Sequence, residues 1–317
     1  MKIAIMGSGG DAPGMNPAIK RFVELCFELD HIPFFICDGL EGLIDGKIIK
    51  ANYKDVAGII HRGGAIIGSS RSQRWYEKSY RAKAYDNLAK IGIEALIVLG
   101  GDGSFRALDL FRKEFDINFI GIPTTIDNDI YGTDLCLGVD TALNVIRDAI
   151  DKIRDTASTL ARAFVVETMG RECGYLAAVS AITSGAEVCV IPEVDFNKSL
   201  ATTILRQEIQ NGRRYILAVV AEGSKRTKEI ATWLEKDIGM ETRITVLGHI
   251  QRGGNPSIKD RLLGFGFVVE AIEALARGEE GHIVIYKQGT FSTLPLNEAL
   301  KTYTIDTEIL SLINFLD

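Results

Sequence analysis

The feature that most constrains the fold of this 317-residue chain is a repeated succession of apolar strand, glycine-containing loop and helix. Residues 2–6 form a short apolar run, glycines follow between 7 and 14, and residues 17–29 carry apolar side chains at helical spacing. Strands are also predicted at 94–101, 119–123, 162–170, 187–192, 215–223 and 243–248. Because helical segments alternate with these strands, the pattern predicts an α/β fold with mostly parallel sheets and helices on both faces.

The glycines indicate where function should be sought. Glycine supplies 32 of the 317 residues, about a tenth against a usual ~7%, and many of these glycines follow predicted strands. In sheets of this kind, ligands bind beyond the carboxyl ends of the strands. The loops that follow the strands are therefore the candidate functional segments.

Composition excludes several classes of function. The net charge is 36 − 42 = −6, which argues against nucleic-acid binding, because that activity needs a basic surface. It does not argue against a small phosphorylated substrate. The five cysteines include no C-x-x-C pair, so we expect buried, reduced thiols in a cytoplasmic protein. We also expect no signal peptide and no membrane span, since no apolar run approaches 18 residues.

Two glycine loops could hold phosphate groups. The loop at 9–16 lacks the Gly-Lys-Ser/Thr of a Walker A sequence, and it fits either a phosphate cradle or a plain tight turn. The loop at 100–104 places Asp102 between glycines, where a carboxylate could hold Mg²⁺ beside a polyphosphate. The alternative is that Asp102, or Ser104 instead, merely caps the following helix.

A third loop, residues 123–129, combines two carboxylates and an amide after a strand. A kinase acting on an alcohol needs a base for the hydroxyl proton and Mg²⁺ for the phosphoryl charge, and paired acids could divide these roles. The alternative is a turn rich in Asp and Asn. Arg171 follows a glycine at another strand end, and we expect it to begin a helix where its guanidinium would face an anion.

These loops carry a family resemblance. The motifs GGDAPGMN, GSSR, GGDGS, TIDND, VETMGR, VAEG and LGHIQRGG occur in the order seen in 6-phosphofructokinases. From residue 1 to about 286 the chain resembles a bacterial-type, ATP-dependent member of that family. The resemblance implies two Rossmann-like doubly wound domains with mostly parallel sheets that share chain crossings. Residues 1–138 and 251–302 would bind the nucleotide, and residues 139–250 and 303–317 the sugar phosphate.

The resemblance also implies phosphoryl transfer from ATP to O1 of fructose 6-phosphate, and it assigns site residues. The implied nucleotide contacts are Gly10, Arg71, Ser72, Gly101, Asp102, Gly103 and Ser104, with Asp102 holding Mg²⁺. Asp127 would be the base and Arg171 would stabilise charge on the transferring phosphoryl group, beside Thr125, Met169 and Gly170. The implied sugar-phosphate contacts are Glu222, His249 and Arg252, with Arg162 and Arg243 reaching the 6-phosphate of a neighbouring subunit. A homotetramer with shared sites is therefore expected.

The sequence departs from the family pattern in two places. Gly103 matches ATP-dependent members, whereas similar pyrophosphate-dependent members carry Asp there. Thr124 matches neither the Gly of the first group nor the Lys of the second, so pyrophosphate stays the alternative donor. An effector site for ADP or phosphoenolpyruvate would include Lys20, Arg154, Glu187 and Arg213. Since Glu24, Tyr53 and Asn211 stand where basic residues are expected, we expect weak or altered allostery.

Two other functions fit the sequence less well. An NAD or lipid kinase would share GGDG but would lack TIDND and GHIQRGG, both of which are present. A non-catalytic regulatory subunit that binds nucleotide and sugar phosphate would be expected to lose Asp127, Asp102 or Arg171, and all are present.

Overall fold

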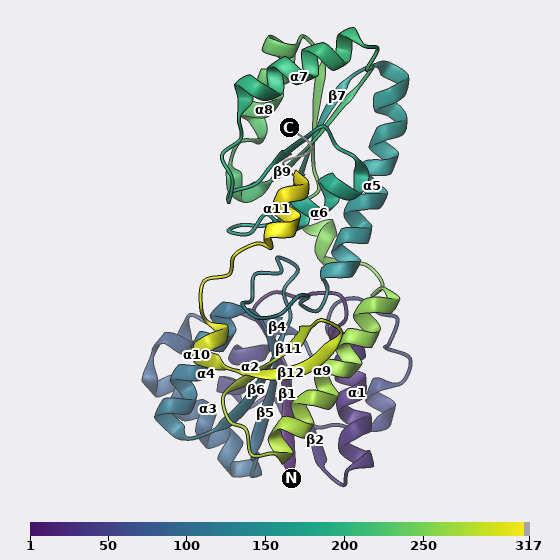
Figure 1. The fold of residues 1–317 in the computed structure, drawn as a ribbon. Coiled ribbons are helices and arrows are strands. Elements are labelled where there is room, and N and C mark those ends of the chain that lie inside the picture. The colour runs from purple at the N-terminus through teal and green to yellow at the C-terminus, as the bar shows by residue number, and fades with distance from the viewer. Residues whose placement is uncertain (314–317) are drawn as a thin grey trace. The chain divides into compact units, whose positions relative to one another are not determined.

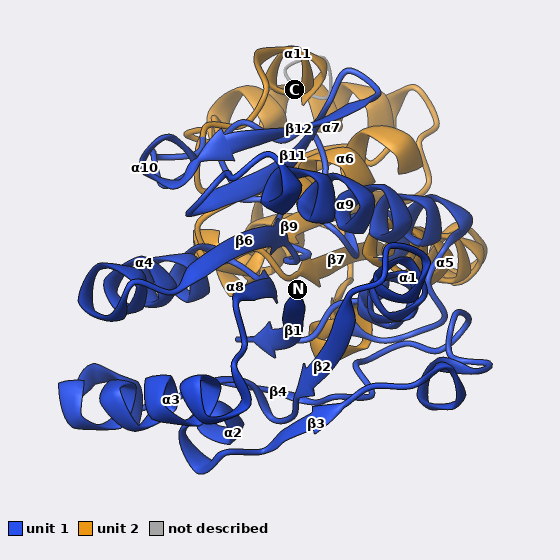
Figure 2. Ribbon diagram, turned by 90° about the horizontal axis from the view of Figure 1, so that it is seen from below, with its two compact units in different colours: residues 1–141, 252–303 blue, residues 142–251, 304–317 orange. Residues whose placement is uncertain are grey.

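A computed structural model describes residues 1–313 of the chain. Internal contacts divide it into two compact units (Figure 2). Unit 1 comprises residues 1–141 and 252–303, and unit 2 comprises residues 142–251 with the C-terminal residues from 304. Each unit is therefore assembled from segments that lie far apart in the sequence.

Unit 1 is built on one large, mostly parallel sheet (Figure 1). Its strands are β1 (Lys2–Ser8), β2 (Ile32–Ile36), β3 (Ile48–Lys50), β4 (Ser69–Ser70), β5 (Ala95–Gly100), β6 (Asn118–Pro123), β11 (His282–Lys287) and β12 (Thr290–Pro295). They are ordered β12-β11-β6-β5-β1-β2-β3, with β4 beside β1. β3 and β12 pair antiparallel at the two edges, and the other pairings are parallel.

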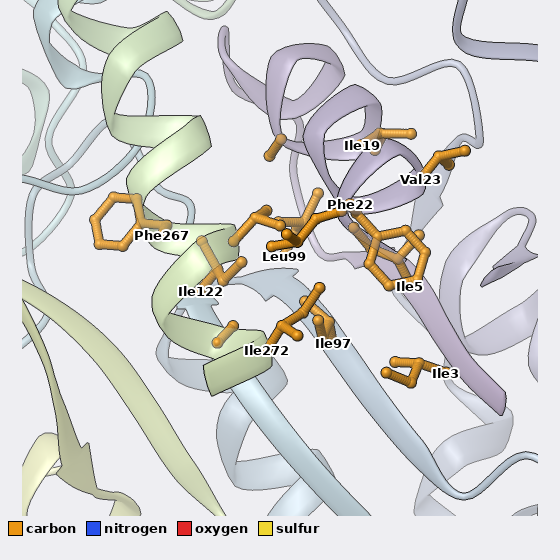
Figure 3. Packing of buried hydrophobic residues seen from close by; sticks show 14 of the residues in the cluster. Ile3, Ile5, Ile19, Phe22, Val23, Ile97, Leu99, Ile122, Phe267 and Ile272 are labelled. Carbon is orange, nitrogen blue, oxygen red and sulfur yellow. The ribbon is translucent and has the colours of Figure 1, made fainter. Parts of the chain in front are cut away.

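Helices cover both faces of this sheet (Figure 2). One face carries α1 (Met15–Glu28) and α9 (Ile258–Ala276), and the other carries α2 (Gly39–Asp45), α3 (Lys78–Ile91) and α4 (Asp102–Phe115). Short segments complete the unit, namely η1 (Tyr53–Val56), η2 (Arg74–Tyr76) and α10 (Leu296–Ala299). Apolar residues spaced along α1, including Phe22, pack on Ile5 of β1 and Leu99 of β5 (Figure 3). This burial is the main force that holds the helices to the sheet.

Unit 2 is built on a smaller sheet whose strands all run parallel. The strands are β7 (Ala163–Thr168), β8 (Val188–Val190), β9 (Ile216–Ala221) and β10 (Thr242–Val246), in the order β10-β7-β9-β8. The helices are α5 (Val139–Leu160), α6 (Tyr175–Ser184), α7 (Lys198–Gln210), α8 (Thr227–Trp233) and α11 (Thr307–Ile313), with short η3 (Glu222–Ser224), η4 (Leu234–Ile238) and η5 (Gly248–Arg252). Trp233, Leu205 and Ile216 anchor a core between α7, α8 and the sheet.

The α/β fold with mostly parallel sheets, predicted from the alternating pattern, is confirmed. β1, β5, β7 and β9 are buried almost throughout, as expected for strands covered on both faces. β10 differs from this expectation, because it is an edge strand and leaves Ile244 and Val246 44% and 59% exposed. None of the five cysteines forms a disulfide, and all are buried except Cys37, which is partly exposed. Burial raises the pKa of Cys26 to about 12. Among the described residues, no helix has the length and apolarity to cross a membrane.

One buried carboxylate of unit 1 joins the start of α9 to residues 138–141. Asp260, in the first turn of α9, is fully buried and accepts hydrogen bonds from the backbone N–H groups of Gly138 and Thr141, each at 2.8 Å. The Thr141 hydroxyl also donates to Asp260 and accepts from the backbone N–H of Ser257 at 2.9 Å. All of these residues belong to unit 1, so the Asp260 carboxylate holds the start of α9 and residues 138–141 together within this unit.

Replacing Asp260 by alanine is expected to lower the free energy of unfolding by about 3 kcal/mol at pH 7, because buried backbone donors lose their acceptor. Burial raises the pKa of Asp260 to about 6, above the ordinary value of about 3.9. The folded state therefore binds the proton of the Asp260 carboxyl group more tightly than the unfolded state does. This proton binding adds to the free energy of unfolding, fully below about pH 4, and the added stability is lost as the pH rises through 6. Urea unfolding at pH 5, 6 and 7 should show the deficit of the variant growing toward acid pH. A deficit that shrinks toward acid pH would contradict this assignment.

Candidate active site

In unit 1, the candidate residues lie in loops at the aligned carboxyl ends of neighbouring strands. β5 pairs with β1 through Gly7 and Leu99 and with β6 through Gly100 and Pro123. The Ser104 hydroxyl donates to the Ser8 carbonyl at 2.9 Å, which ties the second glycine loop to the end of β1. The three loops therefore form one connected edge, as the topology of a parallel sheet requires.

Neither residue proposed as a cap of α4 has that role. The N-cap is Gly101, and the helix begins at Asp102, which places Ser104 in its first turn. Among the described residues, no side chain caps this helix, so its positive N-terminal end is open to an anion. The Asp102 carboxylate is 40% exposed and pairs with Arg106 at 2.8 Å.

Two glycines of this loop have no structural reason to be glycine. A Cβ atom added to Gly103 would meet nothing within 4 Å, and one added to Gly101 would meet only Thr125, at an ordinary 3.7 Å. Neither residue has the positive φ that favours glycine. Gly100 is different, because a Cβ there would lie 2.8 Å from the Cβ of Ser104. The open space at Gly101 and Gly103, over the uncapped N-terminal end of α4, suits a ligand that contacts the backbone directly.

The third loop is held by its amide residue. Asn128 is buried with a φ of 54°, and its side chain donates to the Asp134 carbonyl at 3.0 Å and accepts from the Cys136 N–H at 2.8 Å. Asn128 thus supplies the turn that the alternative interpretation required. The neighbouring Asp127 is partly exposed, and its backbone N–H donates to the Thr125 hydroxyl at 3.3 Å. Its carboxyl group is therefore carried on a well-defined turn.

The remaining candidates of unit 1 are Gly10 on the first glycine loop, Arg71 and Ser72 after β4, and Arg252. The Arg252 guanidinium donates to the Asp11 carbonyl at 3.3 Å. A Cβ on Gly10 would lie 2.3 Å from this guanidinium, which is the far end of a flexible side chain and could move aside, so the contact alone does not require glycine. Arg71 is exposed, whereas Ser72 is buried and accepts from the Trp75 N–H at 3.2 Å.

In unit 2, the candidate residues again follow aligned strand ends. The turn after β7 contacts the turn after β9, since the Gly223 N–H donates to the Gly170 carbonyl at 3.0 Å. Glu222 is partly buried in the turn after β9. The expectation that Arg171 begins a helix is wrong, because α6 starts only at Tyr175. The reason is the φ of +123° at Gly170, which turns the chain away from a helical path and leaves Arg171 exposed.

Gln251 is a residue of this site that the sequence reasoning did not select. It is fully buried, its side-chain oxygen accepts from the Met169 N–H at 3.1 Å, and its amide donates to the Gly248 carbonyl at 2.9 Å. It therefore fastens the MGR turn to the GHIQRGG segment, where His249 is exposed. Nothing in the sequence distinguishes Gln251 beyond its place between the candidate ligands His249 and Arg252.

Replacing Gln251 by leucine is expected to raise the KM for the sugar substrate about tenfold, because the turn that carries Met169 and Arg171 loses a buried hydrogen bond. The KM for the phosphoryl donor should change less than twofold. Steady-state kinetics with each substrate varied in turn measures both values. An equal rise in both KM values would indicate general damage to the fold instead.

Two arginines assigned to the 6-phosphate meet on one carboxylate. Arg162 contacts Glu241 at 2.7 Å, and Arg243 also pairs with Glu241. Both arginines remain partly or largely exposed, with 30% and 52% of their side chains accessible. The cluster carries two positive charges and one negative charge, so it keeps a net positive charge available to an anion. Glu241 was not identified from the sequence.

The residues assigned to an effector site are already paired with acids or carbonyls. Lys20 pairs with Glu24 one helical turn away. In unit 2, Arg154 donates to the Ser184 carbonyl, and Arg213 pairs with Glu187 and, at 2.7 Å, with Glu208. Burial raises the pKa of Glu187. A cavity of about 550 Å³ beside Arg213 is lined by Ser158, Glu208, Asn211, Gly212, Arg214 and Tyr215.

Asp102 is the residue of this site that could hold Mg²⁺. The described part of the chain contains no group of three or more His, Cys, Asp or Glu side chains that could enclose a metal ion. Mg²⁺ in kinases is commonly held by one or two carboxylates together with substrate phosphates. The accessible Asp102 carboxylate at the open end of α4 fits such a shared site.

Comparison with known proteins places this arrangement in a family. A family model described as phosphofructokinase matches residues 2–275. The chain is 56% identical to the ATP-dependent 6-phosphofructokinase of Sulfurimonas denitrificans over 98% of both chains, and 44% identical to that of Thermotoga neapolitana over 99% of both.

Solved structures agree with this placement. Phosphofructokinase from Saccharomyces cerevisiae matches with a TM-score of 0.91 at 32% identity, over 99% of this chain and 47% of the yeast chain. The pyrophosphate-dependent enzyme from Marinobacter aquaeolei matches with a TM-score of 0.85 over 100% of this chain and 91% of that one, but at 19% identity it shares the fold alone. The family model, the high sequence identities and the shared fold agree, and the chain belongs to the phosphofructokinase family.

Proposed function

We propose that this protein transfers the terminal phosphoryl group of ATP to O1 of fructose 6-phosphate, giving fructose 1,6-bisphosphate and ADP, the committed step of glycolysis. The observation that carries the proposal is the pair of glycines, Gly101 and Gly103, that flank Asp102 at the open end of α4 without any internal need for glycine. The names of the similar bacterial proteins support the same activity.

Unit 1 would bind the phosphoryl donor. The polyphosphate would lie on the backbone at Gly101 and Gly103, and Asp102 would hold Mg²⁺, which would neutralise phosphate charge. Asp127 would accept the proton of the sugar hydroxyl as that oxygen attacks the terminal phosphorus. Thr125 would line the same site, and its hydroxyl orients the Asp127 turn through a hydrogen bond from the backbone.

Unit 2 would bind the sugar phosphate. Arg171 would stabilise negative charge on the transferring group, because this charge spreads over the phosphoryl oxygens in the transition state. Met169, Glu222 and His249 would contact the sugar. The net positive cluster of Arg162, Arg243 and Glu241 would receive the 6-phosphate of a sugar bound in a neighbouring subunit.

ATP is favoured over pyrophosphate by the surroundings of residues 103 and 124. The open space at Gly103 leaves room for a nucleotide phosphate. Thr124 is buried, and its hydroxyl donates to the Ile122 carbonyl at 3.0 Å, so it adds no charge to the donor site. The test is an assay of the purified protein with fructose 6-phosphate and Mg²⁺, offering ATP or pyrophosphate in turn. Turnover with ATP is expected. Faster turnover with pyrophosphate would reverse the assignment of the phosphoryl donor, and no turnover with either compound would contradict the proposed enzymatic activity.

Self-association fits the surface of unit 2. The edge strand β10 exposes Ile244 and Val246, which form an apolar strip on one face of the strand, whereas Arg243 lies on the opposite face because side chains alternate along a strand. A homotetramer in which Arg162 and Arg243 serve a neighbouring active site would bury this strip. Sedimentation measurements would give the number of subunits.

Weak allosteric regulation is expected. An anionic effector such as ADP or phosphoenolpyruvate would have to displace Glu24 from Lys20 and Glu208 from Arg213. We therefore expect either compound at 1 mM, on the order of a metabolite concentration, to shift the half-saturating fructose 6-phosphate concentration by less than about twofold. Saturation curves with and without each compound measure the shift, and a strong sigmoidal shift would contradict the prediction.

A further inference from the structure

The segment that carries Arg71 and Ser72 is anchored to the first glycine loop. β4 pairs in parallel with the end of β1. The Gly9 N–H donates to the Ser70 carbonyl at 3.1 Å, and the Ser69 hydroxyl donates to the Gly9 carbonyl at 3.1 Å. The residues that follow, 71–76, leave the sheet and run toward α2 and α4.

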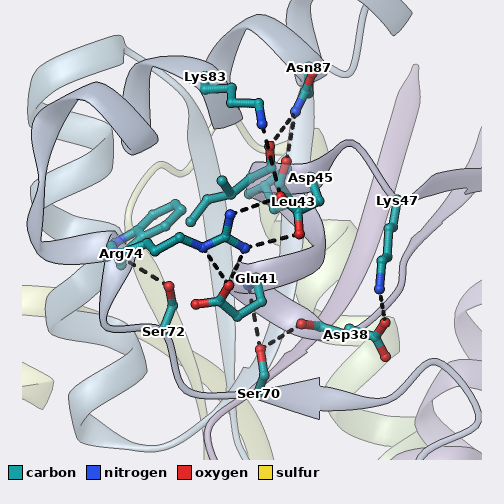
Figure 4. Close-up of polar contacts among 12 residues, drawn as sticks. Asp38, Glu41, Leu43, Asp45, Lys47, Ser70, Ser72, Arg74, Lys83 and Asn87 are labelled. Carbon is teal, nitrogen blue, oxygen red and sulfur yellow. Dashed lines mark hydrogen bonds and ion pairs between the residues drawn. The ribbon is translucent and has the colours of Figure 1, made fainter.

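Arg74 links this segment to α2 through a multiply bonded guanidinium (Figure 4). Its Nε donates to Glu41 at 2.7 Å, and its two terminal nitrogens contact the two oxygens of Asp45 at 2.9 and 3.0 Å. The Tyr80 ring lies 5.5 Å from the guanidinium carbon. A guanidinium bound by several hydrogen bonds is held more rigidly than one in a single surface ion pair, because the bonds fix both the position and the plane of the group.

Segment 71–76 contacts α4 as well as α2. The indole N–H of Trp75 donates to the Ala107 carbonyl at 3.1 Å. The buried Arg81 donates to the Trp75 carbonyl at 2.5 Å and binds Glu114 of α4 at 2.7 and 2.9 Å. Since α4 begins at Asp102, segment 71–76 spans the interval between α2 and the helix that carries the second glycine loop.

Ser72 is coupled to the Arg74 contacts as well as to the backbone. Hydrogen bonds from Arg74 and then from the Ser72 hydroxyl lower the pKa of Glu41, so its carboxylate is charged at neutral pH. Ser72 also accepts from the Trp75 N–H. The Ser72 hydroxyl therefore lies beside the carboxylate that Arg74 binds and is also held by the Trp75 N–H.

We propose that Arg74 is a positioning residue for the phosphoryl donor, which by bridging Glu41 and Asp45 holds the backbone of Arg71 and Ser72 where the donor binds. The inference rests on the proposed function, since it takes Arg71 and Ser72 as donor contacts. Arg74 itself touches no reacting group. It acts through the segment that it anchors, so its effect is specific to the donor.

The test compares Arg74→Ala with Arg277→Ala. Arg277 offers a matched control in the same unit, because it also bridges two carboxylates, Glu270 at 2.7 Å and Glu279 at 2.6 Å, and is similarly accessible. Arg74→Ala should raise the KM for ATP and the dissociation constant of Mg·ATP about fivefold to twentyfold, less than the ~10² that a full ångström of misplacement costs. The KM for fructose 6-phosphate and kcat should change less than twofold.

A further variant separates positioning from general stability. Arg74→Lys keeps the charge but loses the fork, so it should fall between wild type and Arg74→Ala. An unchanged ATP constant in Arg74→Ala, or an equal rise in Arg277→Ala, would overturn the inference.

The inference and the proposed function fail in different ways. A wild-type protein that binds Mg·ATP but does not turn over contradicts the proposed function, while the binding constants of the variants still decide the role of Arg74. A wild-type protein that turns over with ATP, with equal ATP affinity in Arg74→Ala, contradicts the inference alone. A wild-type protein that neither binds nor turns over ATP contradicts both.

Discussion

Replacing Asp127 by serine is expected to lower kcat by about 10²–10⁴, the usual contribution of a positioned general base. The turn itself should survive, because Asn128 holds it through contacts to Asp134 and Cys136 that do not involve the Asp127 side chain. The KM values for both substrates should change much less than kcat, because the lost interaction belongs to the transition state. Steady-state kinetics gives these constants, and circular dichroism checks the fold.

The control for this prediction is Asp86→Ser. Asp86 is an exposed residue of α3 in the same unit, so the same chemical change there should leave kcat within twofold of wild type. An Asp127→Ser variant with nearly wild-type kcat would show that another group accepts the hydroxyl proton.

Replacing Gly103 by aspartate is expected to raise the KM for ATP by about two orders of magnitude, because a carboxylate beside a phosphate costs several kcal/mol and each 1.4 kcal/mol is tenfold. The fold should not suffer. A Cβ at this position meets no atom within 4 Å, and an acidic residue suits the first turn of a helix. Thermal unfolding should therefore give a Tm equal to or slightly above that of wild type, while kinetics shows the loss of donor affinity.

Gly103→Ala serves as the uncharged control. Alanine adds only a methyl group, so the KM for ATP should rise far less than with aspartate, while helix stability gains up to ~1 kcal/mol. The KM for fructose 6-phosphate should stay within twofold in both variants. Aspartate at 103 with an unchanged KM for ATP would show that the donor does not lie on this helix end.

Much of the fold could be predicted from the sequence because its signals are local. The glycine loops after apolar runs predicted strand ends, and the mostly parallel α/β fold is confirmed. The predicted helical entry at Arg171 is wrong, since one positive φ at Gly170 redirects the chain. The exposure of β10 was not predicted either, because strand order in the sheet depends on contacts between distant segments.

The candidate site divides in the same way. Motif residues such as Asp102, Asp127 and Arg171 could be selected from the sequence, because their chemistry and spacing are visible there. Gln251, Glu241 and Arg74 could not, since their importance lies in which partners they meet. Gln251 reaches Met169 across 82 positions, Glu241 lies 79 positions from Arg162, and Arg74 lies 33 positions from Glu41.

The sequence by itself therefore determined the family, the type of fold and the chemistry at the strand ends, because these follow from residue type and local spacing. Only the tertiary structure decided which glycines need to be glycine. Crowding by the Ser104 Cβ and the Ser8 carbonyl explains Gly100, whereas open space at Gly103 leaves a ligand as its reason. The physical cause is that packing depends on atoms brought together from distant parts of the chain, and local spacing does not specify those contacts.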